Sequence, residues 1–400
     1  PLTDRSQLDS AYVAPTTDVE RTLAGLWQDL LGVDSVGTED NFFDLGGHSL
    51  IAVRLFARIK KTYQVDLPIS ILFEAPTIAK CAKTIAEHIG EGPEGEEQPR
   101  RSVALRRFKH LVAMHEGEGK PRTPIFLVAG MFGNILNLRH LAHLLGTDRP
   151  FYGLQARGLY GDEAPHRSFY DAAADYIMEL RTVQPHGPYL LGGFSGGGII
   201  AYELAQQLLA TGEEVAMLAF LDTPMPVRPY LSKRDKLIIH KQEFLKQGVP
   251  YLGRWLRDRI SWEIRKVLNR LRTPEPVSET SFHNAEIEAA FNMAAEQYTL
   301  RPWYGPLTLF RPPMPRQWQV SKGRWVSPEL RYIYEDNGWT PWAPALNIVE
   351  VTGDHDSMVL EPNVRVLAER MRTCVEAAER AMQAPKIPDK DCPIVTAAAE

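Results

Sequence analysis

Cysteine is scarce in this chain of 400 residues: Cys81, Cys374 and Cys392 lie far apart and in no metal-ligand spacing. They indicate neither a disulfide framework nor a zinc site, and they suit the reducing cytoplasm. No apolar run approaches the ~20 residues that span a bilayer, and the N-terminal stretch lacks the basic and apolar regions of a secretory signal. Because the chain begins with Pro1 rather than Met, we expect a piece of a longer protein.

A large excess of positive or negative charge is also lacking. The net charge is −5, which offers no general basis for binding nucleic acid. The apolar fraction of 44% is ordinary for a globular chain, and 400 residues predict two or three domains.

The stretch IGEGPEGEEQPRRS, residues 89–102, is rich in Gly, Pro and Glu and predicts a linker. We therefore expect a small domain at 17–89, a linker at 90–104, a large domain at 105–384 and a flexible tail at 385–400. Apolar residues recur at helical spacing in the small domain, and Thr17 with Glu20 fits a capping box. Further helices at about 49–63 and 76–89, with one turn near 68–73, predict a small helical bundle.

The large domain alternates apolar strands with amphipathic helices, which predicts an α/β fold with a mostly parallel sheet. The predicted strands are PIFLVAG, PFYGLQA, PYLLGGF, VAMLAFLD, PLTLFRPP and LNIVEVTG. From about 224 to 299 the pattern changes to long basic helices, so we expect a helical insertion in the sheet.

The large domain contains G-x-S-x-G at Gly193–Gly197, between a predicted strand and a predicted helix. That context is the one required by a nucleophile elbow, in which a sharp turn raises the hydroxyl of Ser195 above the sheet. A Gly-rich turn without catalysis is the alternative reading.

A serine nucleophile needs a base, and the base needs an orienting acid. Asp222 ends the strand after the elbow, and His355 follows the last strand, in the chain order Ser, acid, His. Asp354 and Asp356 flank His355, but side chains of adjacent residues diverge, so Asp222 is the better acid. Helix capping by Asp222 and a solvated loop position for His355 are the alternatives.

A tetrahedral intermediate also needs two amide donors. We expect one from Gly196, directly after the nucleophile, and one from Met131 in the loop after the first predicted strand.

The motifs PIFLVAGMFGN, PFYGLQARG, PYLLGGFSGGG, LAFLDTP and VTGDHDSM together resemble the thioesterase domains that end nonribosomal peptide and polyketide synthases. The resemblance implies an α/β-hydrolase fold, a Ser195–Asp222–His355 triad, and a lid formed by the insertion at about 224–299. One departure is the stretch Ala129–Gly133, where the family often has H-G-A-G-G.

The stretch NFFDLGGHSL, residues 41–50, resembles the attachment site of peptidyl carrier proteins, and this likeness extends over about 17–89. It implies a four-helix carrier bundle with 4′-phosphopantetheine bound covalently to Ser49. Because Ser49 begins a predicted helix, free amides and the helix dipole favour a phosphodiester there. A simple N-cap role is the alternative.

Both resemblances together predict the terminal step of a nonribosomal peptide (or hybrid polyketide) assembly line. An acyl or peptidyl chain passes from Ser49 to Ser195, and water or an internal nucleophile releases it as an acid or a ring. The implied partners are condensation and adenylation domains upstream, a phosphopantetheinyl transferase and the thioester substrate. A carrier-fused lipase or esterase, or a non-catalytic tethering scaffold, are the rival readings.

Two stretches of the insertion combine apolar residues at helical spacing with many Lys and Arg side chains. A solvated helix face is the default reading. The alternative is a docking surface for acidic residues of the carrier motif, namely Asp34, Glu39, Asp40 and Asp44.

Overall fold

The computed structural model describes residues 11–47, 49–65, 67, 71–89, 108–115, 117–119, 122–159, 163–251, 253–257, 261 and 284–383. The expected linker at 90–104 and tail at 385–400 lie outside these residues, as does much of the second basic stretch of the insertion. No helix in the described ranges is long and apolar enough to cross a bilayer.

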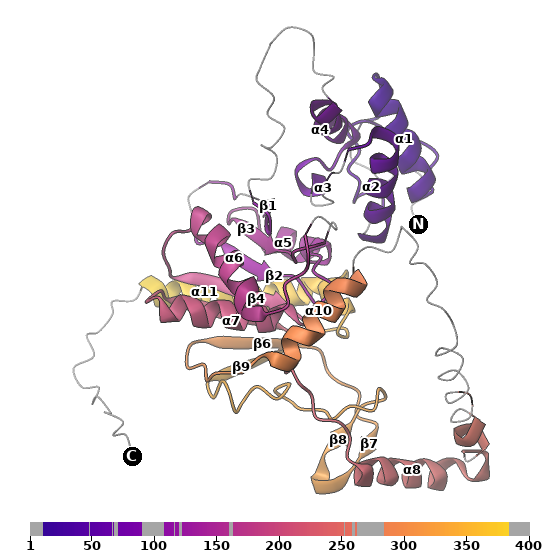
Figure 1. The fold of residues 1–400 in the computed structure, drawn as a ribbon, viewed down its shortest axis with the longest axis vertical. Helices are drawn as coiled ribbons and strands as arrows, with labels where there is room; N and C mark the ends of the chain where they lie inside the picture. The colour runs from indigo at the N-terminus through magenta and orange to yellow at the C-terminus, as the bar shows by residue number, and fades with distance from the viewer. Residues whose placement is uncertain are drawn as a thin grey trace.

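The N-terminal unit is a group of helices, α1 (Asp18–Leu31), α2 (Ser49–Tyr63), α3 (Ile71–Glu74) and α4 (Ile78–Ile89). Thr17 and Glu20 form the predicted capping box, and Gly32 ends α1 in the left-handed conformation. The apolar faces of the helices meet in a core of their own that includes Trp27 and Phe42. Figure 1 shows these indigo and violet helices grouped beside the sheet of the larger unit.

The larger unit is built on a sheet with strand order β1-β3-β2-β4-β5-β6-β9. Its strands are β1 (Leu111–His115), β2 (Ile125–Val128), β3 (Phe151–Leu154), β4 (Tyr189–Phe194), β5 (Val215–Leu221), β6 (Leu307–Arg311) and β9 (Leu346–Glu350). All neighbouring pairs are parallel except β1 with β3. The predicted mostly parallel sheet is therefore confirmed, with β1 as an additional antiparallel edge strand.

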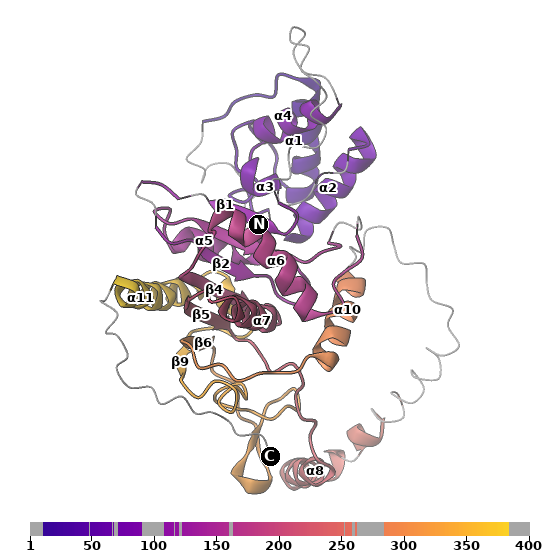
Figure 2. The ribbon, with the colours of Figure 1, turned by 60° about the vertical axis from the view of Figure 1, so that its left-hand side comes forward.

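Helices cover both faces of this sheet (Figure 2). One core cluster joins the sheet to α6 (Phe169–Val183) and α7 (Gly197–Ala210), and another joins it to α5 (Arg139–Leu144) and α11 (Val364–Gln383). The 3₁₀ turn η2 (Leu136–Leu138) leads into α5. Because parallel strands all end at one edge, the loops after β2, β4, β5 and β9 meet there.

Between β5 and β6 lie the insertion helices α8 (Lys233–Gln247) and α10 (Asn284–Gln297). α10 crosses the sheet unit, where Ala294 and Ala295 enter its core. α8 instead packs against a small hairpin, β7 (Trp318–Gln319) and β8 (Trp325–Val326), and against η3 (Ser321–Gly323). Figure 1 shows α8 and this hairpin together, at a distance from the sheet.

The side chain of Asp235 fixes α8 to the hairpin region. It is fully buried, and it accepts hydrogen bonds from the backbone and hydroxyl of Ser321, from Tyr332 and from Arg324. Of the five tryptophans after 300, Trp303 and Trp339 are buried in the core of the sheet unit.

Candidate active site

Ser195 stands at the sharp turn between β4 and α7, with a φ of 51°. Its backbone amide donates to the carbonyl of Leu221, which ties the turn to the neighbouring strand. A Cβ on Gly193 would lie 2.4 Å from the backbone of Gly197, and a Cβ on Gly197 would lie 2.1 Å from the carbonyl oxygen of Ala129. The two glycines of G-x-S-x-G are therefore required by close backbone approach.

Asp222 and His355 lie in loops at the same edge of the sheet. Asp222 directly follows β5 with a φ of 46°, and its amide donates to the carbonyl of Phe310 on β6. Its side chain is largely buried. His355 lies in the loop after β9, and its ring stacks on Phe194 with centroids 5.4 Å apart. This stacking holds the imidazole plane beside the elbow.

The three side chains form a continuous hydrogen-bonded chain. The Nε2 of His355 lies 2.9 Å from the Oγ of Ser195, and its Nδ1 lies 2.7 Å from the Oδ2 of Asp222. An ionised carboxylate can only accept, so Nδ1 carries the proton and Nε2 accepts from the serine hydroxyl. This is the tautomer in which an imidazole serves as a base toward serine.

Of the two acidic neighbours of His355, Asp354 is engaged in its own turn. Asp354 accepts hydrogen bonds from the backbone and hydroxyl of Ser357 and from the amide of Asp356. These bonds, led by the Ser357 amide, hold the pKa of Asp354 below its ordinary value. Asp354 therefore holds the first residue of the turn η4 (Ser357–Val359), and Asp356 is exposed.

Asn337 contacts the carboxylate of Asp222, and the sequence analysis did not predict this contact. Its side-chain amide donates to the Oδ1 of Asp222 at 2.8 Å and to the carbonyl of Thr223 at 3.2 Å. The indole of Trp339 donates to the same carbonyl. The stretch Asp-Asn-Gly predicts a turn, and Asn337 indeed has a φ of 51°, but no local pattern indicates its distant partner.

The expected amide donors lie beside the elbow. Met131 is in the loop after β2, and Gly196 directly follows Ser195 at the start of α7. A Cβ on Gly196 would meet the ring of Phe291 at 2.4 Å, so α10 packs closely over this point.

A cavity of about 40 Å³ opens beside Met131, beneath α10. Its walls come from the loops after β2 and β3 and from α6, α7 and α10, and are mostly apolar. The lining residues are Ala129, Gly130, Met131, Gly133, Ala156, Arg157, Pro165, His166, Phe169, Ala172, Tyr176, Ile200, Ile287 and Phe291.

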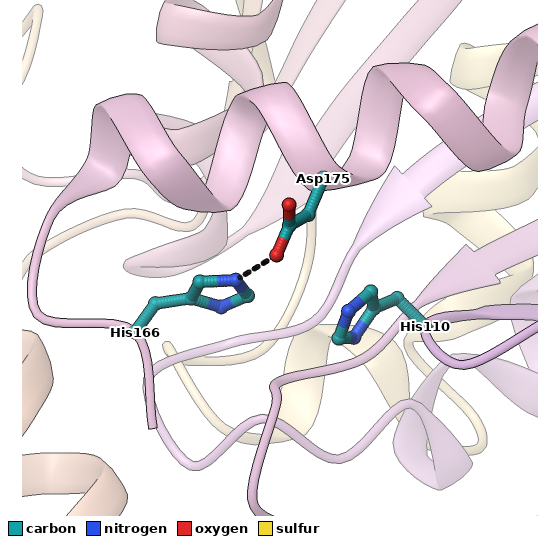
Figure 3. A group of neighbouring side chains, drawn as sticks. All are labelled: His110, His166 and Asp175. Carbon is teal, nitrogen blue, oxygen red and sulfur yellow. Dashed lines mark hydrogen bonds and ion pairs between the residues drawn. The ribbon is translucent and has the colours of Figure 1, made fainter. Parts of the chain in front are cut away.

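His166 belongs to a polar group behind this cavity, with His110 and Asp175 (Figure 3). Among the described residues, it is the group whose spacing permits a metal ion. However, the Nε2 of His166 lies 2.8 Å from Asp175, closer than the about 3.3 Å between two ligands of one zinc ion. Arg157 also reaches the same carboxylate oxygen, and burial lowers the pKa of both histidines. The arrangement is that of a hydrogen-bonded neutral histidine.

In the N-terminal unit, α2 begins at Ser49, and no acidic residue lies in its first turn. Gly46, with a φ of 90°, supplies the bend before the helix, and a Cβ on Gly47 would lie 2.4 Å from Phe42. A helix start without a competing carboxylate suits a phosphodiester, so the residues fit a phosphopantetheine group.

Comparison with known proteins agrees with both units. Residues 21–85 match the family model described as a phosphopantetheine attachment site, and residues 123–325, just over half of the chain, match the model described as a thioesterase domain. The chain is thus a phosphopantetheine-binding carrier unit followed by a thioesterase.

Three curated relatives are named as synthetases or synthases, one of them as a nonribosomal peptide synthase. Malpinin synthetase of Mortierella alpina is 32% identical over 348 residues, 87% of this chain. Chondramide synthase cmdD of Chondromyces crocatus is 31% identical over 97% of this chain, and the dimodular nonribosomal peptide synthase of Bacillus subtilis is 41% identical over 52%. The aligned regions span 4%, 10% and 8% of those proteins. The chain therefore belongs to the thioesterase domain family, with a phosphopantetheine attachment unit ahead of that domain.

Proposed function

We propose that this chain releases an acyl or peptidyl chain from its own carrier unit, as the terminal step of an assembly line. The observation that carries the proposal is the hydrogen-bonded series Ser195–His355–Asp222, with distances of 2.9 and 2.7 Å, in a chain that also has a phosphopantetheine attachment unit. We assign 17–89 to the carrier domain and 105–384 to the thioesterase domain.

Ser49 is the proposed attachment residue. When bound, 4′-phosphopantetheine supplies a thiol that holds the acyl chain as a thioester. The start of α2 contributes free amides and the positive end of the helix dipole toward the phosphodiester. Gly46, where a Cβ would meet no atom within 4 Å, leaves the approach to Ser49 open for a phosphopantetheinyl transferase.

Ser195 acts as the nucleophile. His355 takes the hydroxyl proton on Nε2 while Oγ bonds to the thioester carbonyl carbon. Asp222 stabilises the imidazolium through Nδ1. His355 then donates the proton to the departing thiolate, the C–S bond breaks, and an ester remains on Ser195. The amides of Gly196 and Met131 donate to the carbonyl oxygen as it becomes negative.

Release repeats these steps with a second nucleophile. His355 deprotonates either water or a hydroxyl or amine of the acyl chain, and the ester bond to Ser195 breaks. Water gives a free acid, and an internal nucleophile gives a ring. The imidazole is 40% exposed, so water reaches it without a change in the loop.

Condensation and adenylation domains upstream are the proposed source of the acyl chain, as in the synthetases that the chain resembles. The proposed location is the cytoplasm, and the described thiols of Cys81 and Cys374 are free, which is compatible with its reducing conditions.

The test loads the full chain with an octanoyl-phosphopantetheine arm, using octanoyl-coenzyme A and a transferase of broad specificity. Intact mass then follows loss of the acyl group. Ser195→Ala is expected to retain octanoate on the arm, because the covalent transfer cannot occur. Release by Ser195→Ala at the wild-type rate contradicts the proposal. A scaffold without catalysis predicts no difference between the two proteins.

A further inference from the structure

The carrier unit and the thioesterase unit touch through a small, mixed surface. The guanidinium of Arg139, at the start of α5, lies 4.0 Å from the centre of the Phe43 ring and 3.5 Å from the Oδ1 of Asp44. Both partners are in the loop that precedes the attachment helix α2. A cation thus contacts an aromatic face and a carboxylate at one point.

Apolar contacts surround this ion pair. Leu136, in the 3₁₀ turn before α5, is 7% exposed and packs with the core cluster of the carrier helices. The short helix α3 of the carrier lies against the edge strand β1. The contact therefore combines a buried leucine, a charged pair and an aromatic ring, which are the components of a specific interface.

This surface lies close in sequence to the attachment residue on one side and to the loop of Met131 on the other. Phe43 and Asp44 precede Ser49 by a few residues, and η2 and α5 follow directly after the loop that contains Met131. The contact thus joins the segment that begins the attachment helix to the segment that borders the elbow and the cavity.

We propose that the surface formed by Leu136 and Arg139 is the docking site through which the thioesterase receives its own carrier unit, with Phe43 and Asp44 as its recognition residues. This inference rests on the proposed function, since docking matters only if a chain is transferred between the units.

The first basic stretch of the insertion, which forms α8, fits less well as the docking surface that the sequence left open. The described lid helix α8 lies far from α1–α4 in both views of the molecule (Figures 1 and 2). Asp40 is fully buried and accepts a hydrogen bond from the amide of Gly37, so it belongs to the fold of its own loop. Asp44, by contrast, is exposed enough to serve as an interface residue and has Arg139 beside it.

The physical strength of the contact suits a transient encounter. The side chains of Arg139 and Asp44 are 26% and 58% exposed, and burial lowers the pKa of the guanidinium while Asp44 opposes that shift. A half-exposed ion pair with one cation–π contact raises the equilibrium constant for docking by roughly five- to thirtyfold. That is enough to favour one orientation, yet weak enough for the carrier to leave.

The test measures single-turnover loss of octanoate from the loaded arm in full-length Arg139→Glu, Asp44→Arg and the double variant. Each single variant is expected to be about five- to thirtyfold slower, because it places like charges together. The double variant restores opposite charges and is expected within about threefold of the wild type, with a residual loss from the missing contact to Phe43.

Octanoyl N-acetylcysteamine thioester serves as the second substrate, since it reaches Ser195 without the carrier. Its kcat/KM is expected to be unchanged in all three variants. Arg370→Glu is the matched control: Arg370 is exposed on α11, about 200° around the helix from Arg372, whose guanidinium contacts α5. It makes the same charge change and is expected to leave both rates unchanged.

Equal slowing of both substrates by Arg139→Glu would show an effect on the site itself and overturn the docking role. A double variant no faster than the slower single variant would also overturn it. If the wild type releases octanoate from the small thioester but Arg139→Glu leaves transfer from the arm at full rate, the docking proposal fails while the proposed function stands. No release from either substrate by the wild type refutes both.

Discussion

At the scale of the residue, the acid is the group whose surroundings are most completely defined. Both carboxylate oxygens of Asp222 accept hydrogen bonds: Oδ2 from the Nδ1 of His355 and Oδ1 from the side-chain amide of Asn337. The carboxylate therefore has one orientation, which presents it to Nδ1 of the imidazole. Asp354, although adjacent to His355 in sequence, accepts hydrogen bonds on its Oδ1 from its own turn.

Substitutions of Asp222 and of its hydrogen-bond partner Asn337 are expected to lower kcat to different extents. Asp222→Asn is expected to lower kcat about 10⁴-fold, because the amide favours the wrong tautomer of His355. Asn337→Asp is expected to lower kcat by about 10- to 100-fold with little change in KM, because it replaces a donor by a second carboxylate. Asp354→Asn is expected to stay within about threefold. Hydrolysis of octanoyl N-acetylcysteamine thioester measures all three.

Asn347→Asp is the matched control for Asn337→Asp, because Asn347 is exposed on β9 and gains the same charge. Aspartate tolerates the left-handed φ of position 337, so the thermal midpoint of Asn337→Asp is expected to stay near that of the wild type. If Asp354→Asn proves severe and Asp222→Asn mild, the assignment of the acid is wrong.

Sequence reasoning predicted the approach of Ser195, Asp222 and His355 because each ends a strand, and the ends of parallel strands share one edge. It could not predict Asn337, which lies 115 positions from its partner. Only the path of the loop between β8 and β9 brings the two together. A turn motif indicates how the backbone bends, but not which distant side chain it reaches.

At the scale of the element, strands and helices with strong periodicity were predicted well. The predicted helix at about 49–63 coincides with α2, and the six predicted strands correspond to β2, β3, β4, β5, β6 and β9. The strand β1 was missed because a five-residue edge strand carries little periodic signal. The hairpin β7–β8 has two residues in each strand, and long-range contacts with α8 hold it.

The attachment of α8 leads to a prediction about the insertion. We expect amide hydrogen exchange in α8 to be faster than in β4 and α7, because α8 has few buried residues of its own. Asp235→Asn is expected to accelerate exchange in α8 further. The hydroxyl of Ser321, with those of Tyr332 and Ser232, holds the pKa of Asp235 well below its ordinary value. The ionised anchor is therefore present at neutral pH and is lost only as pH falls through its lowered pKa.

Exchange monitored by mass spectrometry at neutral pH tests this. Asp171→Asn, an exposed aspartate on α6, is the control and is expected to leave exchange in α8 unchanged. Equal protection of α8 and α7 in the wild-type chain would argue instead that α8 is a fixed part of the core.

At the scale of the whole molecule, each unit buries core clusters largely of its own, which allows the two units to keep their folds while they exchange a substrate. The carrier helices bury their own cluster, to which the thioesterase contributes Leu136, and the sheet unit buries the others. A change at the attachment residue should therefore abolish loading without disturbing the sheet unit.

Ser49→Ala separates these two properties. Ser49 is the first residue of α2, and replacing one serine at a helix start costs at most about 1 kcal/mol, so the variant is expected to remain folded by circular dichroism. With coenzyme A and a transferase it is expected to gain no 4′-phosphopantetheine by intact mass, while it still hydrolyses octanoyl N-acetylcysteamine thioester at the wild-type rate. Ser168→Ala is the matched control, because Ser168 caps α6 through its hydroxyl and its loss has a similar cost. The control is expected to gain one phosphopantetheine; the same gain in Ser49→Ala would place the attachment at another residue and remove the starting point of the proposed transfer.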